Sequence, residues 1–312
     1  MSVQPSEFYT PKVLGAQLTG MIKTKGENEY SARLRIPVGL LTADALESLA
    51  RLCRKHGRGE ILLTARYGVE LPGVTGEGFE ALRQELADAG IGLAGCGPRM
   101  RTTTACRGTV CPHGNVDTFH LAWEIDRRYN DAEVLPHKFK VGVSGCASSC
   151  SKPQLNDVGL MGAARPECDP NACTGCGVCV EACHLAAMTI EQGLPRMDRR
   201  ACVSCGDCIK ACPLGAMKAG RTGLHLFAGG RWGRMKQVGI QIAEFLAEPE
   251  AIEAVGRIKA WYRDSGEPKE RLGQSILRIG VERFQAEVLD GVDREKWTPI
   301  TPEALERFQP LR

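Results

Sequence analysis

The spacing of its cysteines constrains this chain more than any other feature. Of its 15 cysteines, twelve fall into three groups of four, two of them compact and one split into two distant pairs. The split group contains Cys106, Cys111, Cys146 and Cys150; the compact groups contain Cys173, Cys176, Cys179 and Cys183, and Cys202, Cys205, Cys208 and Cys212. A cubane iron–sulfur cluster takes four thiolate ligands. The twelve cysteines therefore predict three [4Fe-4S] clusters in a multi-electron redox protein.

Each compact group repeats the spacing C-x2-C-x2-C-x3-C, which is typical of bacterial ferredoxins with two clusters. In that pattern the fourth cysteine of one run binds the cluster of the other run. One cluster would then take Cys173, Cys176, Cys179 and Cys212, and the other Cys202, Cys205, Cys208 and Cys183. Glycines between these cysteines would let the backbone wrap each cluster and point amides at its sulfurs.

Two other uses of the compact cysteines are less consistent with the sequence. Zinc also binds paired C-x2-C units, but the repeated run and the closing Pro213 favour iron. Disulfide frameworks belong to short secreted domains, whereas this chain has 312 residues. His184 stands where the first run would usually carry proline, and we interpret it as a loop residue that tunes its cluster.

Composition predicts a soluble enzyme of a reducing compartment. The net charge is only +3, which implies neither nucleic acid nor an acidic membrane as a partner. The N-terminus has no apolar signal region, and no stretch approaches the roughly 18 apolar residues of a membrane span. We therefore expect a cytoplasmic protein without a membrane span, in an anaerobic setting.

Hydrophobic periodicity predicts an α+β unit over residues 1–90. Residues 28–37 alternate as a half-buried strand does, and residues 60–71 read as a second strand. A helix should begin after Thr42 as N-cap and stop at Gly57, and a second helix should cover about 77–89. The buried face of the first helix should carry Leu46, Leu49, Leu52 and Cys53, and that of the second Phe79, Leu82 and Leu86.

The rest of the chain predicts a domain interrupted by an insertion. Residues 161–172 look irregular and residues 218–234 are rich in glycine, so both read as linkers. Between them, residues 166–220 would form an inserted ferredoxin domain with two clusters. The host domain would comprise residues 91–165 and 221–312, with 236–264 as a helix.

Four segments together resemble one known family, the sirohaem-dependent sulfite and nitrite reductases. They read LLTARYGVELPGV, RTTTACRGTVC, LPHKFKVGVSGCASSC and AGGRWGRM. The chain is most similar to the catalytic subunit of anaerobic, assimilatory-type sulfite reductase with an inserted ferredoxin module. The resemblance implies a sulfite-reductase-like half-unit, with a ferredoxin-like N-terminal part and a sirohaem- and cluster-binding α/β part. It also implies that Cys150 bridges the split cluster to the sirohaem iron. The family's first pair is usually C-x5-C, whereas Cys106 and Cys111 are four residues apart.

Four cations match the anion-binding positions of that family: Arg66, Arg101, Lys138 and Lys140. Reducing a small oxyanion requires fixed positive charge and a proton supply. Arg66 lies in an apolar segment that reads as a strand, where a cation is unusual. Lys138 and Lys140 are two residues apart, so on a strand both would project from one face. A solvated charged surface is the alternative interpretation.

Sirohaem carries many carboxylates, so its pocket should be cationic. Candidate contacts are Arg99, Arg107, Arg221, Arg231 and Arg234, with the hydroxyls of Thr102, Thr103 and Thr104. His113 and His120 follow the first cysteine pair, but the thiolate bridge makes ordinary polar contacts the preferred interpretation. Of the remaining cysteines, Cys53 reads as core, and Cys96 and Cys168 have no assigned role.

The function expected from these residues is reduction of sulfite to sulfide, with electrons from a donor protein passing through the ferredoxin module. Reduction of nitrite to ammonia at the same site is one alternative, and a non-catalytic electron-relay subunit is another. Six residues of extended strand span roughly 20 Å, which would keep Lys140 away from an iron bound near Cys146. We therefore expect a homodimer, or a higher assembly, in which each chain lends its cations to its partner's sirohaem.

Overall fold

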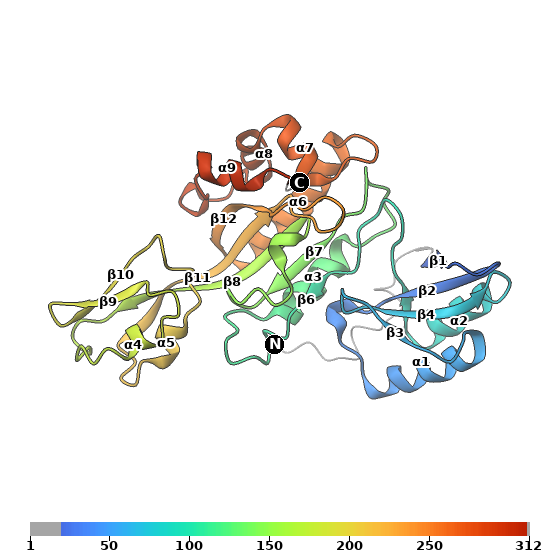
Figure 1. Cartoon of the computed structure of the whole chain (residues 1–312), viewed down its shortest axis with the longest axis horizontal. Helices are drawn as coiled ribbons and strands as arrows, with labels where there is room; N and C mark the ends of the chain where they lie inside the picture. The colour runs from blue at the N-terminus through green and yellow to red at the C-terminus, as the bar shows by residue number, and fades with distance from the viewer. Residues whose placement is uncertain (1–19, 311–312) are drawn as a thin grey trace.

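The computed structural model describes residues 20–310, which form an N-terminal unit, a central domain and a small module (Figure 1). The N-terminal unit and the module lie at opposite ends of the molecule, with the central sheet between them (Figure 1). The first nineteen residues, on which the expectation of no signal region rests, lie outside the described part. None of the described helices is both long and apolar enough to cross a membrane.

The N-terminal unit is an antiparallel sheet covered by two helices. Strand order is β1-β2-β4-β3, with β5 paired to β2. The strands are β1 (Met21–Lys23), β2 (Glu29–Arg35), β3 (Leu62–Leu63), β4 (Val69–Thr75) and β5 (Gly92–Leu93); the helices are α1 (Ala43–His56) and α2 (Phe79–Asp88). Alternate apolar residues of β2 pack against both helices in one core. The α+β prediction for this part of the chain is confirmed.

Helix α1 begins and ends where its sequence signals predict. The hydroxyl of Thr42 accepts a hydrogen bond from the amide of Ala45 at 3.2 Å, and Gly57 follows the last helical residue. Leu49, Leu52 and Cys53 are buried as expected. Leu46 is 50% exposed, so its assignment to the buried face was wrong. Ala45 occupies that face instead.

Residues 60–71 are not one strand. They form the short strand β3, a turn and the start of β4, and the two strands pair with Leu63 opposite Val69. Arg66 therefore lies in a turn and not in a strand. The turn contains Tyr67 at φ 56°, a left-handed conformation that ends the extended run.

The central domain is a mixed sheet in the order β12-β11-β8-β7-β6. Strands β6, β7 and β8 run parallel, and β11 pairs antiparallel with both β8 and β12. They are β6 (Thr104–Ala105), β7 (Val141–Ser144), β8 (Val158–Cys168), β11 (Met217–Ala228) and β12 (Ile240–Leu246). The helices are α3 (Thr118–Tyr129), α6 (Glu248–Ser265), α7 (Leu272–Ile279), α8 (Val281–Val288) and α9 (Pro302–Phe308), and side chains from the sheet and these helices share the largest core.

The two predicted linkers are in fact the longest strands of the protein among the described residues. Residues 161–172 fall largely in β8 and residues 218–234 largely in β11, and the two strands pair along an antiparallel ladder from Met217–Cys168 to Ala228–Val158. One glycine of β11 lies at an irregularity of this ladder: Gly220 is the extra residue between Ala219 and Arg221. The prediction of one helix over 236–264 was half wrong, since β12 precedes α6.

The module lies between the outer ends of β8 and β11. It contains α4 (Val178–Glu181), α5 (Asp207–Ala211) and the hairpin of β9 (Met188–Glu191) with β10 (Leu194–Met197). Cys179, Met188, Cys208 and Met217 form its small core. Such a core is too small to supply much hydrophobic stabilisation by itself, which is typical of domains held together by metal ligation.

Candidate anion pocket and cysteine sites

A cavity of about 300 Å³ lies between the N-terminal unit and the central domain. The four predicted anion-binding cations all line it: Arg66, Arg101, Lys138 and Lys140. Arg33 lines it as well, although no motif in the sequence indicates this residue. The described lining contains one carboxylate, Glu70, and Arg33 already pairs with it at 2.8 Å. The cavity therefore has an excess of positive charge.

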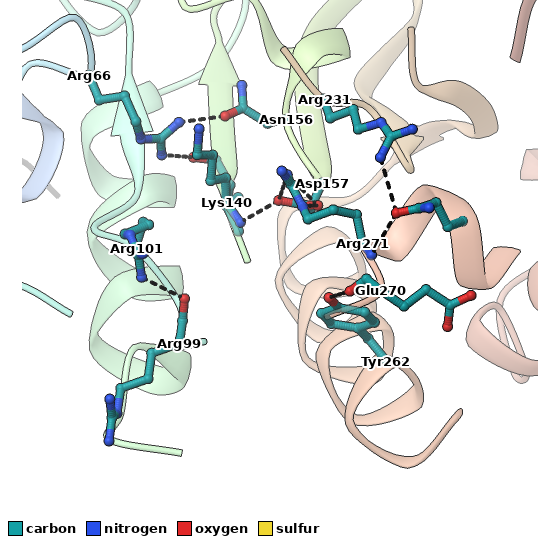
Figure 2. Close-up of polar contacts among 12 residues, drawn as sticks. Arg66, Arg99, Arg101, Lys140, Asn156, Asp157, Arg231, Tyr262, Glu270 and Arg271 are labelled. Carbon is teal, nitrogen blue, oxygen red and sulfur yellow. Dashed lines mark hydrogen bonds and ion pairs between the residues drawn. The ribbon is translucent and has the colours of Figure 1, made fainter. Parts of the chain in front are cut away.

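Arg66 is held by side-chain and backbone oxygens (Figure 2). Its guanidinium donates to Oδ1 of Asn156 at 2.6 Å and to the carbonyl oxygen of Thr102 at 3.2 Å. Arg101 donates to the carbonyls of Arg99 at 3.0 Å and Gly97 at 2.9 Å. Neither arginine has a carboxylate partner among these contacts, so each retains charge for a ligand.

Lys140 is positioned through its backbone. Its amide donates to Oδ2 of Asp157 at 2.9 Å, and Asp157 is fully buried (Figure 2). Arg271 holds the same carboxylate with contacts of 2.8 to 3.1 Å. Because Arg271 neutralises Asp157, this pair adds little net negative charge near the cavity.

Burial and mutual repulsion lower the pKa values of the pocket cations. The pKa of Lys140 falls to about 8, first because of burial and then because Arg66 and Arg271 lie nearby. Burial also lowers the pKa of Arg66 to about 10, and the pKa values of Arg101 and Lys138 shift downward for the same first reason. Lys140 is therefore the cation that most readily gives up a proton close to neutral pH.

The split cysteines follow the ends of two neighbouring parallel strands. Cys106 comes directly after β6, and Cys146 comes shortly after β7. The amide of Gly145 donates to Sγ of Cys106 at 3.1 Å, so the two halves of the group meet. Cys146 is buried and Cys150 is exposed. An amide aimed at a sulfur and an exposed fourth thiol suit a cluster with one open side.

The chain reverses sharply after β7. Ser151 donates from its amide to the hydroxyl of Ser144 at 3.2 Å and from its own hydroxyl to the carbonyl of Val143 at 2.6 Å. The hydroxyl of Tyr67 donates to the carbonyl of Cys150 at 3.2 Å. Cys150 thus lies beside the turn that carries Arg66. The chain is extended along β7 from Val141 to Ser144, as the distance estimate assumed, but it then folds back, so strand length alone does not keep the cysteine loop away from the cations.

The compact cysteines surround two cavities. One is lined by Cys173, Cys176, Cys179 and Cys212, and the other by Cys183, Cys202, Cys205 and Cys208. These are the same two sets of four that the ferredoxin spacing rule assigns. Within the described chain, no three His, Cys, Asp or Glu side chains converge on the position of a single metal ion. The thiols of each compact set instead surround one of the two cavities.

Backbone amides point at several of these sulfurs. The amides of Gly175, Ala187 and Met217 donate to Sγ of Cys173, Cys183 and Cys212 at 3.3 to 3.4 Å. The amide of Met217 is the main reason that the pKa of Cys212 is lowered. Amides in this position stabilise thiolate, which is the form that binds iron.

The second cavity also reaches the central domain. Ala147 and Ser148, which lie between Cys146 and Cys150, line it together with Cys183, Cys202 and Cys205. It measures about 390 Å³. The module therefore presents one cysteine set to the split group and carries the other set farther away.

The predicted sirohaem contacts lie in different environments. Arg231 is buried, and its Nε has no hydrogen-bond partner within residues 20–310, whereas Arg107 and Arg234 are exposed. Thr102 and Thr103 have hydroxyls without partners, but the hydroxyl of Thr104 donates to the carbonyl of Val141.

Two further predicted contacts, Arg99 and Arg221, are already engaged with protein groups, and so are both histidines that follow the first cysteine pair. Arg99 binds backbone carbonyls of Ala132 and Cys96. Arg221 lies on the outer part of β11 beside Glu244, away from the cation pocket. His113 and His120 pair with Asp207 and Glu248.

These observations fit an anionic cofactor and an anionic substrate. Buried donors without partners on Arg231, Thr102 and Thr103 suit acceptor oxygens such as carboxylates. Among the described residues, the cation pocket has no unpaired carboxylate, so a bound oxyanion would relieve the repulsion among its cations. The residues present therefore fit a carboxylate-rich tetrapyrrole next to an oxyanion site.

Sequence reasoning missed the residues that hold the cations in place. Asn156, Asp157 and Arg271 are buried, and their partners are far away in the sequence. The only local signal was a polar Asn-Asp pair immediately before the apolar run of β8. No spacing rule links such a pair to Arg66 or Arg271.

Comparison with known proteins agrees with the fold and the cysteine pattern. Residues 22–89 match the "Nitrite/Sulfite reductase ferredoxin-like half domain", and residues 96–296 match the "Nitrite and sulphite reductase 4Fe-4S domain". Together they define a reductase half-unit made of a ferredoxin-like part and an iron–sulfur part, which implies sirohaem and [4Fe-4S] as cofactors. Because the second match covers well over half of it, the chain belongs to the nitrite and sulphite reductase family.

Individual relatives include several sulfite reductases. The chain is 32% identical over 280 residues to the coenzyme F420-dependent sulfite reductase of Methanocaldococcus jannaschii, covering 88% of this chain and 45% of that relative. It is 25% identical to the assimilatory-type sulfite reductase of Nitratidesulfovibrio vulgaris, over 86% of this chain and 97% of the relative. The chain thus spans less than half the length of the first of these. The crystal structure of dissimilatory sulfite reductase I superposes with a TM-score of 0.71 at 23% identity, covering 88% of this chain and 71% of that one, and so shares its fold.

Proposed function

We propose that this protein reduces sulfite to sulfide at a sirohaem coupled to a [4Fe-4S] cluster on Cys106, Cys111, Cys146 and Cys150. The observation that carries the proposal is the cation pocket. Its described lining has five basic residues and a single carboxylate, Glu70, which pairs with Arg33. Sirohaem would supply electrons to the bound anion, and Cys150, as the exposed member of the split group, would be its bridge. Arg231 and the hydroxyls of Thr102 and Thr103 are the side chains proposed to meet its carboxylates.

The arginines and the lysines of the pocket would have different roles toward the substrate. Arg66 and Arg101 have fixed guanidinium planes, held by neighbouring oxygens, and suit fork-like contacts to oxyanion oxygens. Lys138 and Lys140 carry mobile ammonium groups. Because the pKa of Lys140 is about 8, this residue would be mostly protonated at neutral pH yet able to release its proton. That proton would be one of the two that an oxygen of the anion needs in order to leave as water, and the second would come from solvent.

Electrons would reach the site through the module, which we propose to be a ferredoxin domain with two further [4Fe-4S] clusters. The set Cys183, Cys202, Cys205 and Cys208 shares its cavity with Ala147 and Ser148, so this cluster would be the one that feeds the split cluster. The set Cys173, Cys176, Cys179 and Cys212 would accept electrons from a donor protein. A cubane has four separate irons, so its ligands need not converge on one point.

Two other functions remain as alternatives. Nitrite is also a small anion, and nothing in the cation pocket discriminates against it. An electron-relay subunit without sirohaem would explain the shortened Cys106–Cys111 spacing. The unpaired buried Nε of Arg231 favours the enzyme, because a relay subunit would have no ligand for it.

We also propose a homodimer with composite sites. The reversal after β7 removes the distance argument for a partner subunit, since Cys150 and the Arg66 turn already meet within one chain. What supports the dimer is that the chain matches one ferredoxin-like half domain and one 4Fe-4S domain, and that it covers only 45% of a longer sulfite reductase.

The deciding experiment is spectroscopic. Anaerobically purified protein loaded with clusters should show tetrapyrrole bands in the visible spectrum, and acid extraction should yield sirohaem. Iron analysis should give about thirteen irons per chain, twelve from three cubanes and one from sirohaem. Fully cluster-loaded protein that yields no tetrapyrrole would reject the reductase in favour of the relay subunit.

A further inference from the structure

The module is joined to the central domain through two strands, and their direction determines where the module lies. β8 and β11 pair along their whole length, but β12 pairs only with the inner part of β11, from Leu224 to Ala228. Beyond Leu224 the ladder continues as a two-stranded ribbon toward the module (Figure 1). A two-stranded ribbon twists and bends easily unless something holds it.

Two arginines face each other at the base of this ribbon. Arg165 of β8 and Arg221 of β11 are direct register partners. Like charges opposite one another weaken a strand pair. Glu244 of β12 lies 3.3 Å from Arg165 and 3.8 Å from Arg221, so one carboxylate serves both. The ring of Phe245 lies under both guanidinium groups, at 4.6 Å and 4.8 Å from its centroid.

A β-bulge allows Glu244 and Phe245 to act together. Leu224 pairs with Leu246 and Leu226 pairs with Ala243, so two residues of β12 oppose one residue of β11. Consecutive residues of a regular strand point to opposite faces. At the bulge Phe245 has φ 53°, which re-aims the side chains so that both residues reach the arginines.

The backbone geometry at this bulge is specific. A left-handed conformation is costly for a non-glycine residue, so it persists only where surrounding contacts hold it. Gly223 provides the space: a Cβ there would lie 2.8 Å from Cα of Phe245. His225 packs edge-on against the same ring, with centroids 4.9 Å apart. Gly223 and His225 of β11 thus both pack closely against Phe245 of β12.

With the ribbon in this position, the module contacts the central domain through hydrogen bonds. The amide of Ala164 in β8 donates to the carbonyl of Ser204 at 2.8 Å, and Asn115 donates to the carbonyl of Cys205 at 3.0 Å. Cys205 lines the cavity that Ala147 and Ser148 share. A ribbon that swings away would therefore separate this cysteine set from the split group.

We propose that Glu244 and Phe245 clamp the base of the β8–β11 ribbon, and are thereby positioning residues for electron transfer from the module to the split cysteine group. The clamp itself follows from the contacts above. The electron-transfer part rests on the proposed function, because it requires clusters in both places.

The first arm of the test measures the ribbon and needs no activity. In Glu244→Gln the two arginines lose their shared counter-charge, and in Phe245→Leu they lose the ring while apolar bulk remains. Hydrogen exchange of holoprotein amides at Arg165, Glu167, Cys168 and residues 217–221 should become about 10-fold faster or more in each variant. Glu253→Gln breaks an exposed ion pair with Arg257 on α6 and should leave these amides unchanged. Unchanged ribbon exchange in both clamp variants would overturn the clamp.

The second arm measures electron flow. After rapid reduction of the module, freeze-quenched EPR should show that the split cluster is reduced about 10- to 100-fold more slowly in Glu244→Gln than in wild type. The iron and tetrapyrrole content should be unchanged. If amide exchange becomes faster but the split cluster is reduced at the wild-type rate, the positioning role is rejected. Should the module hold no clusters, the proposed electron path fails, and the exchange measurement still decides whether the clamp exists.

Discussion

Lys140 should make oxyanion binding depend on pH in a way that one substitution removes. Its pKa of about 8 in the folded protein lies below the value of 10.5 usual for lysine, because burial and the nearby Arg66 disfavour its charge. As pH rises through about 8, Lys140 loses its proton in the free protein. The affinity for an anion should then fall by up to tenfold per pH unit. Lys140 is only partly buried, so solvent screening should limit the total loss to about 10- to 100-fold.

The assay is calorimetric titration of oxidised holoprotein with sulfite at several pH values. Lys140→Met keeps most of the apolar stem and removes the charge. This variant should bind more weakly at pH 7 and should lack the inflection near pH 8, and its turnover should fall by about ten- to ten-thousandfold. Sulfite has its own protonation equilibria, but they act equally on both proteins, so the difference between the two curves isolates Lys140. Parallel curves for wild type and Lys140→Met would refute the assignment.

Further predictions concern ligation, assembly and stability. Cys150→Ser should lose sirohaem while module clusters stay reducible by EPR; loss of all clusters together would contradict independent groups. Mixing Cys150→Ser with Lys140→Met chains should restore some activity, and proven mixed dimers without activity would reject shared sites. Asp157→Asn leaves Arg271 buried without its counter-charge and should cost about 3–5 kcal/mol in urea unfolding, whereas a loss below about 1 kcal/mol would refute that role. Burial lowers the pKa of His225 to about 4, below its unfolded value near 6.5. The contribution of His225 to the free energy of unfolding is therefore complete above pH 6.5 and is lost as pH falls toward 4. The expected loss is about 1–3 kcal/mol, and His225→Asn should flatten that slope of melting temperature against pH.

The sequence predicted best what depends on short separations. The cap at Thr42 and the end at Gly57 are local, and the structure has them where the sequence signals lie. The spacing rule for the compact cysteines is local too, and the structure gathers the same sets around two cavities. The family resemblance, which rested on ordered motifs, is confirmed by the matched domains.

Prediction failed where tertiary pairing overrides composition. β11 is rich in glycine and polar residues, which in isolation indicates a loop, but β8 on one side and β12 on the other satisfy its backbone hydrogen bonds. Arg66 was placed in a strand because its neighbours are apolar, yet the left-handed Tyr67 makes a turn there. The reversal after β7 depends on Ser144 and Ser151, whose mutual hydrogen bond has no sequence signature.

The paired strands β8 and β11 have a consequence for how such a chain can be altered. The amide of Asp169 donates to the carbonyl of Ala216 at 2.8 Å, so the module leaves and re-enters the central domain at adjacent points. Neighbouring strands lie about 4.8 Å apart, a gap that a two-residue turn closes. Residues 169–216 could therefore be exchanged for a short hairpin, or for another redox domain with close termini, without moving the central sheet. If the proposed function holds, the source of electrons could then be changed by exchanging the module, while the residues of the cation pocket and the split cysteine group stay the same.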